Sequence, residues 1–224
     1  RRQRQMCIRD RFGTMTKNGD KYENLTSLWD QGGITAVKVH PETGAVFIGY
    51  HSGSWIYQYD GTNFIPKFQL PDAAGAAASK GNINAIAFDK PGTTAYIVSR
   101  KNHVIYKASY DMATGEFSDV KLLAGSFGVT GYADGTGTSA KFNEPSQGDV
   151  DEDGNFYVAD RGNHCIRVIT PDGEVSTYAG QNKAGMVDGI ASLAEFNNPE
   201  GCQFGPDGAL YVADYSNHAI RKVE

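Results

Sequence analysis

The chain has 224 residues, and 40% of them are hydrophobic, which is enough to bury a core. Its formal net charge at pH 7 is −5, from 21 Lys and Arg residues against 26 Asp and Glu residues. A nucleic-acid-binding protein normally carries a basic face that displaces counterions from phosphate, so this balance argues against a nucleic-acid partner. No run of about 18 apolar residues predicts a membrane span.

The first eleven residues look foreign to the rest of the chain. The segment RRQRQMCIRDR, residues 1–11, resembles the translation of a sequencing adaptor with a transposon mosaic end. We expect it to be non-native and exclude it from fold reasoning, as for any fusion scar. Without it, the Lys and Arg count falls to 16, the Asp and Glu count falls to 25, and the net charge becomes −9.

Residues 12–33 predict a hairpin, because a KNGD turn separates FGTMT from KYENLTSLW. After this hairpin, one unit is repeated. The block YVADRGNHCIR at 157–167 returns as YVADYSNHAIR at 211–221, and fainter copies stand at 96–106 and 47–57. The copies start 49, 61 and 54 residues apart. A period of this size is typical of stacked supersecondary units such as propeller blades.

Each unit predicts four short strands, named a to d in chain order, separated by Asp-Gly turns that tolerate the positive φ of a tight reversal. In the third unit the strands are expected near 147–151, 155–160, 164–170 and 174–180. The units are expected at 34–82, 83–146, 147–200 and 201–224, the last one truncated before strand d. With the hairpin as the outer part of a preceding blade, this gives about three full four-stranded blades and two partial ones.

These residues resemble the NHL repeat family, whose units run from a loop ending in FNxP through a DGN turn, YVAD and NHxIR to a strand ending in Ala-Gly. The resemblance covers about 34–224. It implies an all-β fold, an NHL-type β-propeller that is most often six-bladed, here as an incomplete arc. The GYADG insert with NHCIR further resembles envelope proteins of gut Bacteroidetes that carry an immunoglobulin-like TIG domain before the propeller. That likeness implies a location in the cell envelope or outside a bacterial cell.

Histidines recur at one turn position, as His103, His164 and His218. Some lyases with NHL-like propellers hold zinc through histidines in the axial channel. A residue repeated in every blade is spaced around a ring and cannot converge on one ion, so we predict a turn-stabilising hydrogen bond instead. Cys165 and Cys202 fall on non-adjacent strands of different blades, and we predict two free, buried cysteines.

Two further motifs have simple explanations. The run D-x-D-x-D-G at 149–154 matches the start of a calcium loop, but Asp160 stands where the bidentate Glu is needed and no flanking helices are predicted. GTGTSA at 135–140 resembles a dinucleotide fingerprint without the strand before it and the helix after it. We therefore predict no metal, no cofactor and no catalytic residues.

Positions that vary between units are free to bind a ligand. In the b-to-c turns, the residues after the YVAD block are His51, Arg100, Arg161 and Tyr215. On strand a, one equivalent position carries the polar residues Lys38, Asp149 and Gln203, and Ala87 in the second unit. Polar groups on an inner strand must be paired or face a wet channel. They are predicted to line the channel or to form a cross-blade ion pair, two alternatives that stay open here.

We expect the long inserts at 126–146 and 181–200 to share one rim with the b-to-c turns, and we place the ligand there, because long loops on a rigid scaffold concentrate binding residues. The predicted function is a non-catalytic binding or scaffold module for a protein or glycan ligand in the cell envelope. The alternative is a propeller enzyme of the lyase or lactonase kind, with its axial site expected partly on blades missing from this arc. Alone, the chain is expected to self-associate through its open blade faces.

Overall fold

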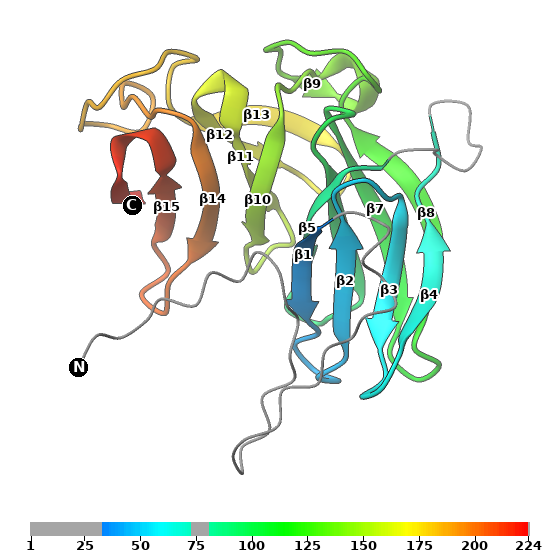
Figure 1. Cartoon of the computed structure of the whole chain (residues 1–224). Helices are drawn as coiled ribbons and strands as arrows, with labels where there is room; N and C mark the ends of the chain where they lie inside the picture. Colours follow the sequence, from blue (N-terminus) through cyan, green and yellow to red (C-terminus); the bar gives the residue numbers. More distant parts are fainter. Residues whose placement is uncertain (1–32, 73–80, 224) are drawn as a thin grey trace.

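A computed structural model describes residues 33–72 and 81–223. Within these ranges the chain forms four antiparallel sheets arranged side by side around a common axis (Figure 1). The first sheet contains β1 (Ile34–Val39), β2 (Val46–Tyr50), β3 (Trp55–Tyr59) and β4 (Phe64–Gln69). The second contains β5 (Ile83–Phe88), β6 (Thr94–Ser99), β7 (Val104–Asp111) and β8 (Glu116–Ala124). The non-native segment expected at 1–11 and almost all of the hairpin expected at 12–33 lie outside the described residues.

The third sheet contains β10 (Pro145–Val150), β11 (Phe156–Asp160), β12 (Cys165–Ile169) and β13 (Glu174–Ala179), with the short β9 (Gly135–Thr136) paired to β13. The fourth contains β14 (Pro199–Phe204), β15 (Leu210–Asp214) and β16 (Ala219–Val223). Each sheet follows chain order from its inner strand outward, which is the pattern of a propeller blade. The predicted all-β propeller is thus confirmed, with two four-stranded blades, a third whose four strands are joined by the short β9, and a three-stranded fourth in the described part of the chain.

The first strand of each blade is innermost. β1, β5, β10 and β14 contact one another in sequence around the axis. Every one of these strands has a shift in register with its neighbour close to its start, between Ile34 and Ala36 in β1 and at the equivalent points of β5, β10 and β14. Such bulges bend a strand and re-aim the side chains beside them.

The apolar core lies between the blades. Phe47 and Phe88 belong to one buried cluster between the first and second blades, Tyr96 and Phe156 to a cluster between the second and third, and further buried residues join the third blade to the fourth. The repeated isoleucine of strand c illustrates the pattern. It is fully buried in the first three blades, as Ile56, Ile105 and Ile166, whereas Ile220 in the fourth is 71% exposed.

The two rims of the arc differ in their connections. The a-to-b turns are short, and each places a glycine at positive φ, which a side chain would strain: Gly44, Gly92, Gly154 and Gly208. The long inserts and the b-to-c turns lie together on the opposite rim, at the top of Figure 1. This is the arrangement that the repeat predicts.

Candidate functional site

Each b-to-c turn is fixed to the chain that leads into its own blade. A turn N–H donates to a carbonyl just before or at the start of strand a, and this bond recurs in all four blades. The bonds are His51 N to Gly33 O (3.0 Å), Arg100 N to Asn82 O (3.0 Å), Gly162 N to Asn143 O (2.8 Å) and Ser216 N to Asn197 O (3.0 Å). Each turn is therefore held against the segment that enters its own blade, which is a long insert only in the third and fourth blades.

The repeated histidines link one blade to the next. His103 and His164 adopt the left-handed conformation, with φ of 57° and 54°. The Nδ1 atom of His103 accepts from the Glu144 N–H at 3.0 Å, and that of His164 accepts from the Asn198 N–H at 3.1 Å. Burial lowers the pKa of both imidazoles, which keeps them neutral and able to accept. The hydrogen bond expected within the turn thus runs between blades. Among the described residues, no group of three His, Cys, Asp or Glu side chains is placed to hold a metal.

A buried ion pair explains the Asp and Arg of the YVAD and NHxIR motifs. Asp160 and Arg167 are both fully buried, with Oδ2 and Nη1 3.1 Å apart. Asp160 also accepts from the Asn143 N–H at 2.8 Å and from the Asn163 amide at 2.8 Å. Burial raises the pKa of Asp160 to about 6, against the opposing effect of these donors and of Arg167. The fourth blade repeats the pair as Asp214 and Arg221, also at 3.1 Å.

Arg167 also binds the long insert that precedes its blade. Arg167 Nη2 donates to the Ala133 carbonyl at 2.9 Å and pairs with Asp134, the aspartate of GYADG, while its guanidinium lies 5.1 Å from the Tyr132 ring centroid. In the fourth blade, Arg221 pairs with Asp188 of the second insert. The first two blades lack both the insert and the pair, and carry Tyr50 with Tyr57, and Ser99 with Tyr106, at the equivalent positions. Insert and ion pair thus occur together.

Two of the predicted rim residues, Arg100 and Arg161, meet in a charged cluster that joins three blades. Arg100 Nη1 and Arg161 Nε each lie 2.8 Å from a carboxylate oxygen of Glu200. Both arginines also reach Glu144, at 3.6 and 3.4 Å. The Lys101 ammonium bonds to Glu144 as well and, with the two arginines, holds the pKa of that carboxyl below its usual range. The two arginine side chains are only 16% and 25% exposed and are paired with two carboxylates, so they act first as supports of the rim.

His51 and Tyr215 are exposed on the first and fourth turns of the same rim. No contact found in the described part of the chain joins either side chain to the charged cluster. The rim positions predicted from the sequence are therefore only partly brought together, because the cluster forms around the second and third turns.

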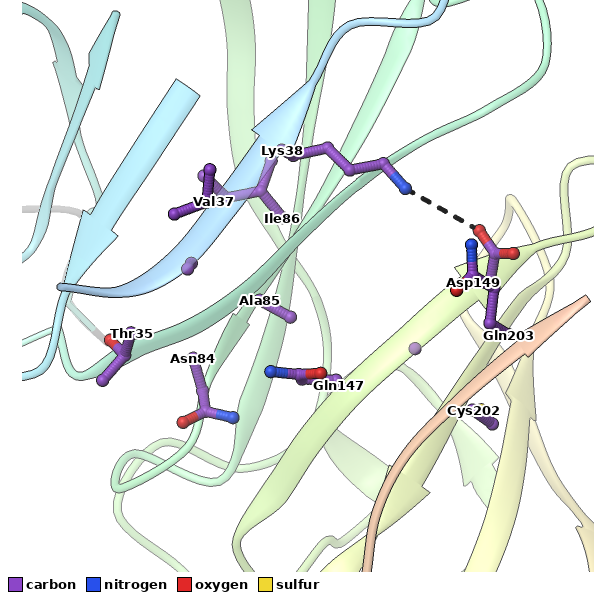
Figure 2. A pocket seen from close by; sticks show the side chains of 12 residues that line it. Thr35, Val37, Lys38, Asn84, Ala85, Ile86, Gln147, Asp149, Cys202 and Gln203 are labelled. Atoms are coloured by element: carbon purple, nitrogen blue, oxygen red, sulfur yellow. Dashed lines mark ion pairs between the residues drawn. The ribbon is translucent and has the colours of Figure 1, made fainter. Parts of the chain in front are cut away.

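The three polar positions of strand a do converge. Lys38, Asp149 and Gln203 line one groove at the axis, between the inner strands of the blades (Figure 2). Lys38 Nζ faces Asp149 Oδ1 at 4.0 Å, across the axis from the first blade to the third. The fourth member of the set, Ala87, is buried in the core. Channel lining and a cross-blade ion pair, which the sequence leaves as alternatives, are both present in this geometry.

The groove has a volume of about 210 Å³ and holds polar residues that the sequence reasoning missed. Asn84 and Gln147 line it, together with Thr35 (Figure 2). Gln147 lies within the register shift between Pro145 and Gly148, at the start of β10. Asn84 and Thr35 lie within the bulges, where the alternation is broken. Asn84 donates to Ser146 Oγ at 2.8 Å, and Ser146 donates to Glu200 at 3.0 Å, which connects the groove to the charged cluster.

The motifs that resemble cofactor sites have structural roles. Asp151 accepts from the N–H groups of Asp153 and Asn155, at 3.0 and 2.8 Å, and so shapes the a-to-b turn. Residues 135–140 form β9 and a short 3₁₀ turn, η2 (Gly137–Ser139), against β13. Cys165 and Cys202 are free and buried, as predicted. Among the described residues, no helix is long and apolar enough to cross a membrane.

Comparison with known proteins supports the interpretation of the repeat. The family model of the NHL repeat matches residues 142–169. Over 97% of its length the chain is 26% identical to Protein SUPPRESSOR OF QUENCHING 1, chloroplastic, of Arabidopsis thaliana, and covers 22% of that protein. Over 31% of its length it is 38% identical to NHL repeat-containing protein 2 of Homo sapiens, and covers 9% of it. The chain thus spans less than a quarter of either relative.

A solved structure extends the likeness to the fold. The crystal structure of an auxiliary nutrient binding protein from Bacteroides thetaiotaomicron superposes with a TM-score of 0.76 at 30% identity. The match covers 86% of this chain and 48% of that one. Repeat, blade geometry and relatives agree, and the chain is an NHL-repeat protein with the β-propeller fold.

Proposed function

We propose that the chain is a non-catalytic binding module whose axial groove and insert-bearing rim hold a glycan or protein ligand in the bacterial cell envelope. The observation that carries the proposal is the convergence of unlike polar side chains from different blades in one groove. Lys38, Asn84, Gln147, Asp149 and Gln203 supply one cation, one carboxylate and three amides. Gln147 and Gln203 are exposed and Lys38 and Asp149 are partly exposed, so these polar groups are open to hydrogen bonding with a ligand that enters the groove.

The composition of the groove favours a neutral or weakly charged polar ligand. Each amide offers both donors and acceptors, which suits hydroxyl groups that also do both. Lys38 and Asp149 largely balance each other, so the groove carries no excess of one charge. The similarity to a Bacteroides protein described as an auxiliary nutrient binding protein supports the same class of function.

The alternative, a propeller enzyme of the lyase or lactonase kind, would need histidine and carboxylate groups directed together at the axis. In the part of the groove that the structure describes, Asp149 faces a lysine and amides, and no histidine lines the walls. This composition favours binding over acid–base chemistry.

The test is an array of immobilised bacterial, plant and host glycans probed with the 224-residue chain and its variants. Gln203→Ala and Lys38→Met change the groove, and Arg100→Ala and Arg161→Ala change the rim. Glu152→Ala and Asp207→Ala are the matched controls on the opposite turns, because both carboxylates form ion pairs at exposed positions that contribute little to stability. Loss of a glycan signal in the groove and rim variants, with the controls unchanged, supports the proposal. Loss of the signal only in the two control variants would place the ligand on the rim of the a-to-b turns and overturn the proposal.

A further inference from the structure

The second residue of each inner strand differs from blade to blade and carries a polar side chain in all four. These residues are Thr35, Asn84, Ser146 and Glu200. Their hydrogen bonds all run from one blade to the next. Thr35 Oγ1 donates to the Ile83 carbonyl, Asn84 Nδ2 donates to Ser146 Oγ at 2.8 Å, and Ser146 Oγ donates to Glu200 Oε1 at 3.0 Å. The four positions thus form an arc of hydrogen bonds around the axis.

Glu200 sets the direction of this arc. Its carboxylate is paired with Arg100 and Arg161, and an ionised carboxylate can only accept hydrogen bonds. Ser146 therefore gives its one hydroxyl hydrogen to Glu200, and toward Asn84 the Ser146 oxygen can only accept. Asn84 must then turn its NH₂ group toward Ser146, because the reversed amide would bring two acceptors together. The orientation of the Asn84 amide follows from this chain of bonds.

The groove is left with fixed acceptors at this end. Asn84 lines the groove, and its Oδ1 atom has no hydrogen-bond partner among the described residues (Figure 2). Thr35 also lines the groove, and because the Ile83 carbonyl takes its hydroxyl hydrogen, Thr35 can only accept as well. Gln147 and Gln203 are different, since both are exposed and can turn either end of the amide toward a ligand.

We propose that Asn84 is a specificity-determining residue of the axial groove, which selects a glycan that places a donating hydroxyl group against Asn84 Oδ1. Ser146 and Glu200 are positioning residues that keep this oxygen available. A ligand with only an acceptor at that point would leave buried polar groups unpaired, which is costly. The inference rests on the binding function proposed above for the groove, and it gives the charged cluster of the rim a role in selecting the ligand.

The probe is the array glycan with the strongest signal that is lost in Gln203→Ala, together with analogues that carry fluorine in place of one hydroxyl at a time. Fluorine is close to a hydroxyl group in size and cannot donate a hydrogen. In isothermal titration calorimetry with the 224-residue chain, we expect at least one analogue to bind about tenfold more weakly than the parent glycan. The ratio of the two affinities measures the requirement for a donor.

Two variants test whether the network causes this requirement. Glu200→Ala removes the acceptor, so Ser146 can give its hydrogen to Asn84 Oδ1 and the amide can turn over. Ser146→Ala frees the Asn84 amide directly. In both variants the ratio for one of the weakened analogues should fall toward one. The matched control is Glu144→Ala, which removes the other carboxylate paired with the same two arginines and has no bond to Ser146. It should keep the ratio of the unchanged chain.

The outcomes separate this inference from the proposed function. If every fluorinated analogue binds as well as the parent glycan, or if neither Glu200→Ala nor Ser146→Ala changes the ratio for any analogue, the role of Asn84 is overturned. An equal fall of the ratio in Glu144→Ala would overturn it as well. In each of these cases the loss of signal in Gln203→Ala leaves the binding function standing. If no array glycan depends on Gln203, the proposed function of the groove fails and this inference fails with it.

Discussion

Asp160 and Arg167 have no solvent exposure, and each provides the counter-charge that the other needs. A buried pair of this kind is weak evidence for added stability compared with an apolar core, but its disruption is costly because one charge stays buried without a partner. The Arg167 guanidinium also bonds to two insert carbonyls and lies over two aromatic rings. The residue therefore couples the sheet to the insert.

Arg167→Ala is expected to lower the free energy of unfolding by about 3–5 kcal/mol, the range for breaking one side of a buried pair. The effect should be measured by urea denaturation. The matched control is Lys222→Ala, which removes an exposed pair with Asp207 and should change stability by no more than about 1 kcal/mol. Similar losses in the two variants would show that the buried network is not what holds the insert.

The repeated histidines predict a pH dependence. Burial lowers the folded-state pKa of His103 and His164. Below a pH of about 6.5, the pKa of histidine in the unfolded chain, folded protein binds fewer protons than unfolded protein. The two neutral histidines therefore stabilise the fold fully above that pH, and this stabilisation is lost as the pH falls below it. Asp160 has the opposite effect on stability. Because its pKa is raised, its protonated form stabilises the fold at low pH, and this stabilisation is lost as the pH rises toward about 6.

The two effects can be separated with the double variant His103→Asn, His164→Asn, because asparagine tolerates the left-handed conformation and does not titrate. Wild type should lose stability relative to this variant as the pH is lowered from 7 to 5. At pH 7, His164→Ala is expected to cost about 1–2 kcal/mol for the lost cross-blade hydrogen bond. A difference between wild type and the double variant that does not vary with pH would contradict the assignment.

At the scale of the element, the strands, their turns and the shared rim of inserts follow from the repeat, because blade positions recur and turn glycines are local signals. The positions of Lys38, Asp149 and Gln203 on the axis follow from alternation in the same way. Asn84 could not be predicted, since the bulge at the start of β5 breaks the alternation that such reasoning relies on. The pairing of Arg100 and Arg161 with Glu200 could not be predicted from the sequence either, because the paired residues are 100 and 39 positions apart in the chain.

The bulge of β10 gives a prediction for one glycine. A Cβ at Gly148 would overlap the Tyr157 carbonyl oxygen and the Phe156 ring, neither of which can yield without moving β11. Gly148→Ala is therefore expected to lower the thermal midpoint, at a cost of about 1–3 kcal/mol for overpacking. Gly33→Ala, where a Cβ would meet nothing within 4 Å, is the control. Unchanged stability of Gly148→Ala would mean that β10 and β11 are not packed as described.

At the scale of the whole molecule, the described blades cover one another except on the outward faces of the first and the fourth, against which no described residues pack. Ile220 is 71% exposed, and Val37 and Val39 are 48% and 55% exposed. Aliphatic residues gathered on open sheet faces favour association. We expect the 224-residue chain to self-associate with rising concentration in light scattering, and Ile220→Glu to shift it toward monomer. A wild-type chain that stays monomeric at high concentration would contradict this.

The central claim, a ligand held in the axial groove, is tested most directly by amide hydrogen exchange with and without a glycan selected on the array. The predicted result is protection of the groove-lining segments of β1, β5, β10 and β14, at residues 35–38, 84–86, 147–149 and 202–203, with little change elsewhere. Protection confined to the a-to-b turns at 40–45 and 151–155 would contradict the account.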